Sequence, residues 1–220
     1  MNVIAIANGK GGSVKSTLAA NIAAYASGSG VRALLIDSDF DQLTLKNWTA
    51  VRRLAQAKFG HGRVPSIPVE VARIEMVSWV LERAADSKFD LVIIDTAAGE
   101  TTSLARIFKL AHLVIIPSQP TAPDIERSKD TARVARRVEA PFRFLLTRVA
   151  TSQGTRARRW HERYEQEGLA LNAHLSNRVA FQDAMTVGMG VCEWAPTSAA
   201  TREIQETYDA VRALLERITQ

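Results

Sequence analysis

"VIAIANGKGGSVKST", residues 3–17, joins a short apolar run to a glycine-rich turn and then to the helix-opening triplet KST. A strand, a glycine-rich turn and a helix that opens at Lys-Ser/Thr together make a nest of backbone N–H groups for phosphate. The pattern G-x-x-x-x-G-K-[ST] is met at Gly9, Lys15 and Ser16 and missed at Val14. A dinucleotide-binding motif fits less well, because the turn holds no G-x-G-x-x-G register. The stretch predicts a phosphate site, with Lys15 along the β- and γ-phosphates and the Ser16 hydroxyl on Mg²⁺.

Val14 stands where the phosphate-loop pattern has glycine. Glycine is used there because the backbone is pressed close to the ligand, so that a Cβ would intrude. By analogy with other steric and strain penalties we expect a loss of about 2–4 kcal/mol. That corresponds to roughly 30- to 1000-fold weaker binding. Nucleotide binding is therefore expected to be impaired and hydrolysis slow.

The pattern of strands and helices around this loop decides the fold class. Short β-branched runs predict strands at 3–7, 32–37, 91–95, 113–117 and 143–148. Helical spacing predicts helices at 16–27, 68–88, 125–138, 155–167 and 201–218. Strands that are apolar on both faces and alternate with helices indicate an α/β, doubly wound, mostly parallel sheet with helices on both faces, of the P-loop NTPase type. The segment 57–68 is interpreted as an exposed loop, and 1–220 as a single domain.

Bulk properties restrict the class of protein. The 220 residues include one cysteine, Cys192, which excludes an intrachain disulfide and is interpreted as a small core residue. The N-terminus does not read as a signal peptide, and no stretch approaches the ~20 apolar residues of a membrane-spanning helix. These features predict a cytoplasmic protein.

Three aspartates follow predicted strands near the phosphate loop. "LLIDSD" (34–39) places Asp37 and Asp39 at a strand end, and "FDLVIIDTAAGE" (89–100) ends an apolar strand with Asp95. A carboxylate in the last position is the usual Walker B arrangement, in which it holds a water on Mg²⁺. An aspartate that ends a strand is often only a cap or a turn former. Three of them near one phosphate loop favour a metal–phosphate site.

Together these motifs resemble the ParA/MinD superfamily. Residues 10–12 and 15–17 resemble its deviant Walker A motif, usually K-G-G-x-G-K-[ST]-T. Residues 37–42 look like its D-x-D-P-Q switch, and 95–99 are similar to its D-T-P-P-G motif. "LVIIPSQPTAPDIE" (113–126) and "ARRWHERYEQEGL", "NRVAFQDAM" and "WAPTSAATREI" further on match small plasmid and chromosome partition ATPases. The resemblance covers essentially the whole chain.

The resemblance implies roles for individual residues. Lys10 would reach across a homodimer to the partner's nucleotide, Lys15 would bind phosphate, and Asp39 would position or activate the attacking water. Ser16, Asp37 and Asp95 would serve the Mg²⁺ shell. The expected ATP contacts are Gly9, Lys10, Gly11, Gly12, Ser13, Val14, Lys15, Ser16, Thr17, Thr147, Arg148 and Pro196, the last three toward the adenine.

Two further departures from the family pattern concern the switches. The first switch reads Asp39-Phe40-Asp41-Gln42, one residue longer than D-P-Q, so that Asp41 rivals Asp39 for the water-positioning role. In the second switch, Ala97-Ala98 replaces two prolines, which should loosen the loop slightly.

The basic residues of the chain are concentrated in one segment. Net charge is +5, yet residues 127–163 alone hold eleven Arg/Lys against three acids, a surplus larger than that of the whole molecule. This asymmetry indicates a polyanion partner, although a solvated pair of arginine-rich helices would look the same. Trp160 could stack on a base, but core packing is the favoured reading.

The resemblance therefore implies a Mg-ATP-dependent partition ATPase that dimerises, binds nonspecific nucleoid DNA, and moves plasmid or chromosome cargo with a ParB-like adaptor. The mixed, acidic polar face of helix 201–218 argues against membrane attachment. From the length of 220 residues we expect no N-terminal DNA-recognition domain. Two alternatives stay open: a non-hydrolysing DNA-binding or scaffold relative, and a MinD-like or cargo-positioning ATPase.

Overall fold

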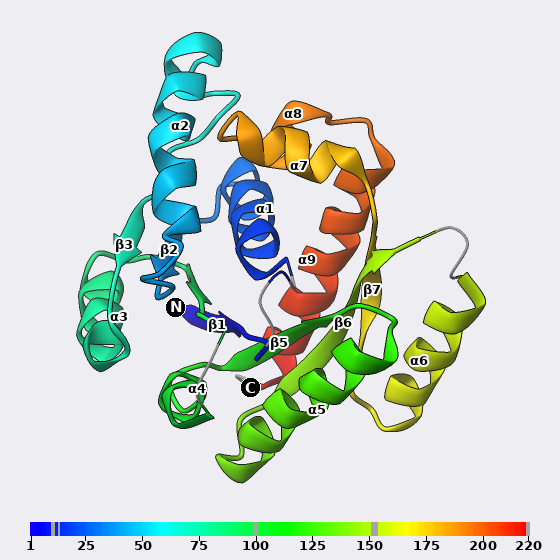
Figure 1. Cartoon of the computed structure of the whole chain (residues 1–220). Coiled ribbons are helices and arrows are strands. Elements are labelled where there is room, and N and C mark those ends of the chain that lie inside the picture. The colour runs from blue at the N-terminus through cyan, green and yellow to red at the C-terminus, as the bar shows by residue number, and fades with distance from the viewer. Residues whose placement is uncertain (10–11, 13, 99–100, 151–153, 219–220) are drawn as a thin grey trace.

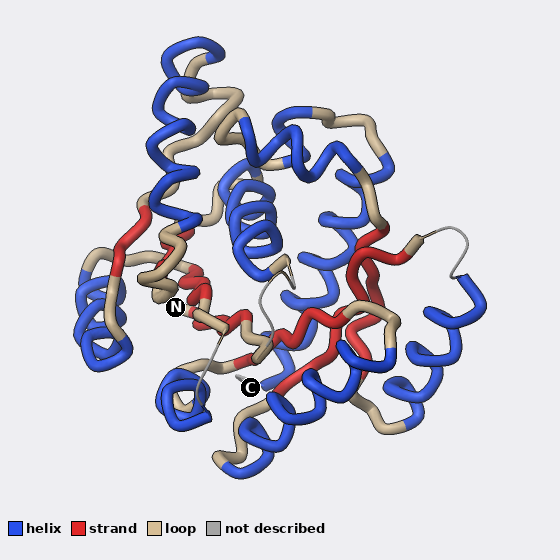
Figure 2. Tube along the Cα trace, in the orientation of Figure 1, coloured by secondary structure: helices blue, strands red, loops and turns tan. Residues whose placement is uncertain are grey.

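The computed structural model describes residues 1–9, 12, 14–98, 101–150 and 154–218. Its centre is a sheet of seven parallel strands in the order β3-β2-β4-β1-β5-β6-β7 (Figures 1 and 2). The strands are β1 (Asn2–Ile6), β2 (Ala33–Asp37), β3 (Val69–Val71), β4 (Leu91–Asp95), β5 (Leu113–Ser118), β6 (Phe142–Val149) and β7 (Ala170–Ser176). The predicted fold class is confirmed.

Helices cover both faces of the sheet, as Figure 1 shows. One face carries α1 (Lys15–Gly28), α2 (Thr44–Phe59), α7 (Val179–Thr186), α8 (Val191–Trp194) and α9 (Ala199–Ile218). The other carries the 3₁₀ turn η1 (Ile74–Met76), α3 (Val77–Asp86), α4 (Thr101–Phe108), α5 (Ala122–Arg137) and α6 (Gly154–Gln166). In the part of the chain that is described, no helix combines the length and the apolar character needed to cross a bilayer.

The alternation of side chains along a central strand explains why two layers of helices form. In β1, Ile4 and Ile6 pack in the cluster with α1 and α9, whereas Val3 and Ala5 pack in the cluster with α3, α4 and α5. Because consecutive side chains of a strand point to opposite faces, an uninterrupted apolar run needs cover on both sides. All four residues are at most 3% exposed.

The prediction of one helix from 68 to 88 is wrong at its beginning. Val69–Val71 forms the edge strand β3, which pairs in parallel with β2 through Leu35 and Val69, and the helix begins only at Val77. Val71 and Ile74 fit helical spacing, but spacing alone does not separate a short apolar strand from a helix. The pairing with β2 decides that Val69–Val71 is a strand, and no local sequence pattern predicts this pairing.

Several other elements were not predicted from the sequence. These are β7, α2, α4, α7 and α8. Because α2 continues to Phe59, the loop interpreted as 57–68 begins later, and it is not wholly exposed, since Val64 and Ile67 are buried. Cys192 is half-buried, and burial raises the pKa of its thiol to about 12, which agrees with its interpretation as a core residue.

Candidate functional site

The carboxyl ends of three adjacent strands bring the predicted loop and carboxylates together. β2, β4 and β1 are neighbours in the sheet, and in their register Asp95 stands opposite Asp37 on one side and Ile6 on the other. Chain segments that follow these strand ends emerge at the same edge, and α1 begins there at Lys15. Ligands bind at this edge in open parallel sheets.

Lys15 lies inside the acidic part of this edge. Its side chain is buried at the start of α1, where the first N–H groups of a helix have no intrahelical partner. Burial lowers the pKa of the Lys15 ammonium, and the negative charges of Asp95 and Asp39 oppose that change. The structure therefore brings Lys15, Asp39 and Asp95 into one electrostatic cluster, as the sequence predicted.

Asp95 is a buried carboxylate whose two oxygens lack hydrogen-bond partners among the described residues. Burial raises the pKa of the Asp95 carboxyl to about 7, and the nearby Ser16 hydroxyl and Lys15 ammonium act in the opposite direction. A buried, unpaired carboxylate is costly unless a ligand satisfies it.

This donor set fits Mg²⁺ bound together with a nucleotide. Mg²⁺ takes hard oxygen ligands and is usually held by one or two protein groups plus phosphates and water. Ser16 and the unsatisfied oxygens of Asp95 would supply the protein part of such a shell. No group of three or more His, Cys, Asp or Glu side chains able to hold a metal by itself occurs in the described ranges.

Asp37 has a different environment from Asp95, although the two lie opposite each other. Its Oδ1 accepts a hydrogen bond from the backbone N–H of Asp39 at 3.2 Å, and its Oδ2 accepts from Leu45 and Lys46, each at 3.0 Å. These bonds hold the first switch and the start of α2. Burial raises the pKa of Asp37, and the three N–H groups oppose that rise. With both oxygens occupied in this way, its predicted role in the metal shell stays a prediction.

The two candidates for the water-positioning carboxylate differ in exposure. Asp39 is 9% exposed, sits beside Lys15, and accepts a hydrogen bond from the Gln42 N–H through Oδ1 at 3.2 Å. Asp41 is exposed. The geometry favours Asp39 over Asp41 for a role at the phosphates.

Val14 adopts a backbone conformation that suits glycine. Its φ is 58° and its ψ 23°, in the left-handed region, immediately before α1. A β-branched residue rarely adopts this region, because its side chain crowds the adjacent peptide. Gly12 in the same turn also has a positive φ, of 74°. Lys10, Gly11 and Ser13 lie outside the described residues, and their predicted roles stay predictions.

A small cavity of about 70 Å³ adjoins the start of α1. Its lining consists of Val14, Thr17, Arg148, Leu175, Ser176, Asn177, Arg178, Phe181 and Gln182. Arg148 was predicted toward the adenine, and the structure brings it beside the loop. Thr147, predicted with it, is fully buried in β6 and does not line this cavity; its hydroxyl has no partner in the described part of the chain. Pro196 is exposed in the turn between α8 and α9 and does not line it either.

The phosphate loop is fastened to α5, a contact that the sequence did not reveal. The Asn8 side chain donates to the Pro117 carbonyl at 2.7 Å and to the Ser128 hydroxyl at 3.2 Å. The Gly9 N–H donates to the Thr131 hydroxyl at 3.1 Å. Both hydroxyls lie more than a hundred positions away from the loop, on the inner side of α5, where no local pattern distinguishes them from ordinary core-facing residues.

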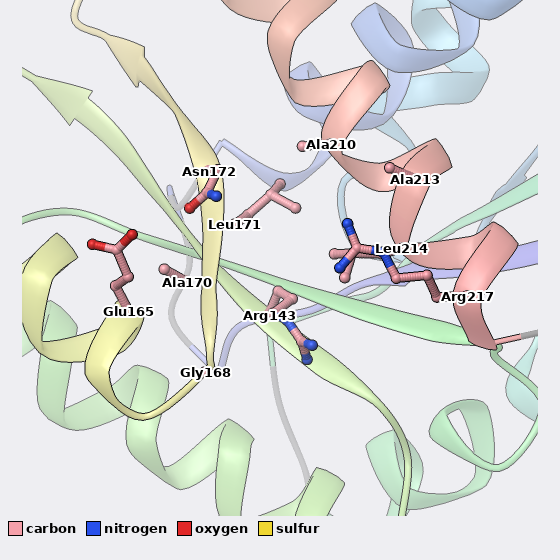
Figure 3. Close-up of a pocket in the computed structure, with 10 residues that line it drawn as sticks. All are labelled: Arg143, Glu165, Gly168, Ala170, Leu171, Asn172, Ala210, Ala213, Leu214 and Arg217. Atoms are coloured by element: carbon pink, nitrogen blue, oxygen red, sulfur yellow. The ribbon is translucent and has the colours of Figure 1, made fainter.

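Another cavity, of about 280 Å³, lies at the opposite edge of the sheet. Figure 3 shows its lining, which includes Arg143 near the beginning of β6, Ala170 at the beginning of β7, and Arg217 near the end of α9. Burial and the neighbouring Arg217 lower the pKa of Arg143. The cavity is remote from the phosphate loop and contains none of the residues predicted for it.

Comparison with known proteins points to one family. The family described as the CobQ/CobB/MinD/ParA nucleotide binding domain matches residues 4–191. A maintenance of carboxysome distribution protein A from Gloeobacter kilaueensis is 28% identical over 219 residues, covering 98% of this chain and 94% of that protein.

Two solved structures share the fold. One is the septum site-determining protein MinD complexed with Mg-ADP from Pyrococcus horikoshii OT3, with 16% identity, a TM-score of 0.75, and coverage of 99% of this chain and 98% of that chain. The other is a putative plasmid partition protein from Borrelia burgdorferi B31 bound to AMPPNP, with 17% identity, a TM-score of 0.69, and 98% coverage of both chains. At these identities the likeness concerns the fold alone.

Proposed function

Since the chain belongs to the CobQ/CobB/MinD/ParA family of nucleotide-binding domains, we propose that it is an ATPase that binds Mg-ATP at the turn between β1 and α1. The observation that supports this most is Asp95. A carboxylate that is fully buried, has no partner for either oxygen among the described residues, and lies beside Ser16 and Lys15 needs a ligand at that place. A magnesium ion held with a nucleotide meets that need.

Each residue contributes a separate part of the chemistry. Lys15 places a positive charge against the phosphates from inside the site, where low dielectric strengthens its effect. The start of α1 offers backbone N–H groups and the positive end of a helix dipole. Ser16 and Asp95 would hold Mg²⁺, which neutralises developing charge on the phosphates when bound. Asp39 orients the attacking water.

The finer parts of the proposal follow from the family resemblance. The chain dimerises around ATP, with Lys10 reaching the partner's nucleotide, and binds nucleoid DNA nonspecifically in the cytoplasm. An adaptor protein of the ParB kind links it to a cargo. By their names, the relatives distribute carboxysomes, select division sites or partition plasmids. The step that we propose for this chain is the shared one, ATP-driven positioning of a cargo.

A titration with ATP and Mg²⁺, followed by light scattering and by phosphate release, tests this proposal. We expect saturable Mg-dependent binding, an increase in mass toward a dimer, and turnover that duplex DNA stimulates. Asp95→Asn should abolish the Mg-dependence while the protein stays folded. ATP binding that is unaffected by this change would refute the assignment of the site.

The backbone of Val14 favours a second candidate, a relative that binds DNA or a partner without hydrolysis. Its left-handed conformation, which suits glycine better than a β-branched residue, supports a loop that is poorly adapted to close phosphate contact. Turnover that is absent in the native chain and restored by Val14→Gly would support this alternative. Absence of turnover in both forms would exclude the enzymatic proposal.

A further inference from the structure

The basic surplus of residues 127–163 is divided between two helices with different surroundings. On α5, Lys129 is paired with Glu126 at 2.6 Å and Arg133 with Asp130, whereas the exposed Arg127 and Arg137 have no carboxylate within ion-pair distance among the described residues. Arg136 on the same helix lies 3.9 Å from Glu167. A positive charge with a nearby carboxylate contributes little to the field that a distant polyanion meets. Three of the five cations of α5 are thus compensated locally.

The first half of α6 is not compensated in this way. Arg156, Arg158 and Arg159 are exposed, and within the described residues none of them has a carboxylate within ion-pair distance. Arg163 has one ion pair among the described residues, at 3.7 Å, with Glu167, the carboxylate that also approaches α5. This carboxylate is close to half exposed. The sequence showed one long basic segment, whereas ion pairing compensates three cations of α5. It leaves Arg156, Arg158 and Arg159 of α6 uncompensated, together with two arginines of α5.

Three of these arginines line one cleft. A hollow of about 660 Å³ lies between the first residues of α5 and the outer face of α6, and its lining is Thr121, Ala122, Pro123, Arg156, Arg159, Trp160 and Arg163. Positions 156, 159 and 163 are spaced by three and four residues, so they share one side of the helix. Trp160 between them is half-buried and packs against the core. It forms a wall of the cleft, in keeping with the core-packing reading.

We infer that this α6 arginine face, formed by Arg156, Arg159 and Arg163, is the surface that contacts the phosphate backbone of duplex DNA. The inference rests on the proposed function and assigns its DNA contact to particular residues. From Arg156 to Arg163 the helix rises about 10 Å. One strand of B-DNA carries about three phosphates over that axial length. Three guanidiniums on one side of a helix therefore match three successive phosphates.

The position of the cleft is compatible with both partners binding at once. α5 and α6 follow the carboxyl ends of β5 and β6, the edge of the sheet that also carries the phosphate loop (Figure 1). α5 begins at the cleft and, farther along, accepts the hydrogen bonds of Asn8 and Gly9 through Ser128 and Thr131. The first turn of α5 thus borders the proposed DNA surface, and the middle of the same helix holds the phosphate loop.

Two variants with the same change in net charge test the inference. The first is R156A/R159A/R163A on α6, and the second is K129A/R133A/R136A on α5. Binding of a fluorescent 30-base-pair duplex is measured by anisotropy at several salt concentrations, with Mg-ATP present. Loss of three phosphate contacts should lower the slope of log K against log salt by about 2.7 for each chain bound. If the curves converge near 1 M salt, this amounts to roughly 500-fold weaker binding at 0.1 M.

The α5 variant should change that slope by less than about one, because its cations are already paired. R156K/R159K/R163K keeps the charges and should keep most of the slope. Circular dichroism melting confirms that all variants are folded. An α6 variant that binds like the native chain, or an α5 variant that loses as much, would overturn the inference and leave the proposed function standing.

Two other outcomes count against the assignment. If poly-glutamate of matched charge binds with equal affinity and with the same dependence on the α6 arginines, the surface serves an acidic protein and the DNA assignment fails. If the native chain binds Mg-ATP but no DNA under any salt condition, the DNA part of the proposed function fails together with the inference.

Discussion

Replacing Val14 by glycine should tighten ATP binding, and the structure limits by how much. Val14 has a left-handed backbone, and a loop that keeps this conformation when it binds nucleotide carries its strain, about 1–2 kcal/mol, both before and after binding, so that the strain largely cancels. What remains is the steric term of its side chain beside Thr17, about 1–3 kcal/mol by analogy with overpacked cores. We therefore expect roughly 5- to 150-fold tighter binding, at the lower end of what the sequence alone suggested.

The same change should affect the stability of the protein without ligand. Relief of the left-handed strain should stabilise it by about 1–2 kcal/mol. The added freedom of glycine in the unfolded chain costs about 0.5–1 kcal/mol of this. The free energy of unfolding should therefore rise by about 0–1.5 kcal/mol.

Isothermal titration with Mg-ATP and with a non-hydrolysable analogue measures the affinity, and urea unfolding measures the stability. Val14→Ala is the matched control, because it shortens the side chain but keeps the Cβ and most of the strain. We expect the alanine form to lie between the other two in affinity and near the native chain in stability. Equal affinities of the native and glycine forms would show that Val14 does not obstruct the site.

Three other substitutions give outcomes that follow from single contacts. Burial raises the pKa of Asp95 from 3.8 to about 7 in the folded state, so the folded protein binds this proton more tightly than the unfolded chain does. The free energy of unfolding should therefore fall as the pH rises between these two values, by up to about 4 kcal/mol. Urea unfolding of Asp95→Asn across this range should lack that decrease, and parallel pH curves for the two forms would refute it. Gly190→Ala places a Cβ 2.3 Å from the Ala24 Cβ and should lower the free energy of unfolding by about 1–3 kcal/mol, which corresponds to a fall of roughly 2–12 °C in the melting temperature. An unchanged melting temperature would show that α8 moves freely away from α1. Arg52→Met leaves Glu193 buried without its cation and should lower the free energy of unfolding by about 3–5 kcal/mol. The double variant Arg52→Met/Glu193→Gln should recover part of this loss. A double variant no more stable than the single one would contradict this account of the buried pair.

The central fold could be predicted because its signals are local. β1, β2, β4, β5 and β6 are apolar runs bounded by turn residues, and their ends carry the loop and the three aspartates. In a parallel sheet the carboxyl ends meet at one edge, so the meeting of Lys15, Asp39 and Asp95 followed from the pattern of strands and helices. Val14 was recognised from its place in the motif. The left-handed backbone of Val14 gives a physical reason for the preference for glycine at this position, which the motif alone did not contain.

The elements that were missed depend on contacts far along the chain. β3 is three residues long, and its conformation comes from pairing with β2. β7 is an edge strand with exposed Asn172 and His174, which weakens the apolar run that identifies a central strand. Thr131 and Ser128, which hold the phosphate loop, are indistinguishable in sequence from other small residues of α5. The distinction between paired and unpaired arginines likewise needs three-dimensional distances.

Taken alone, the chain of amino acids specified the kind of sheet, the position of the phosphate loop and the chemical groups around it. It could do so because strand runs, turn glycines and terminal carboxylates each act within a few neighbouring residues. Only the tertiary structure decided that Asp37 is held by backbone N–H groups while Asp95 is left unsatisfied. It also decided that three cations of α5 are paired, whereas three arginines of α6 line one cleft. Those properties depend on which polar partners come within hydrogen-bond or ion-pair distance, and that is set by packing between distant segments.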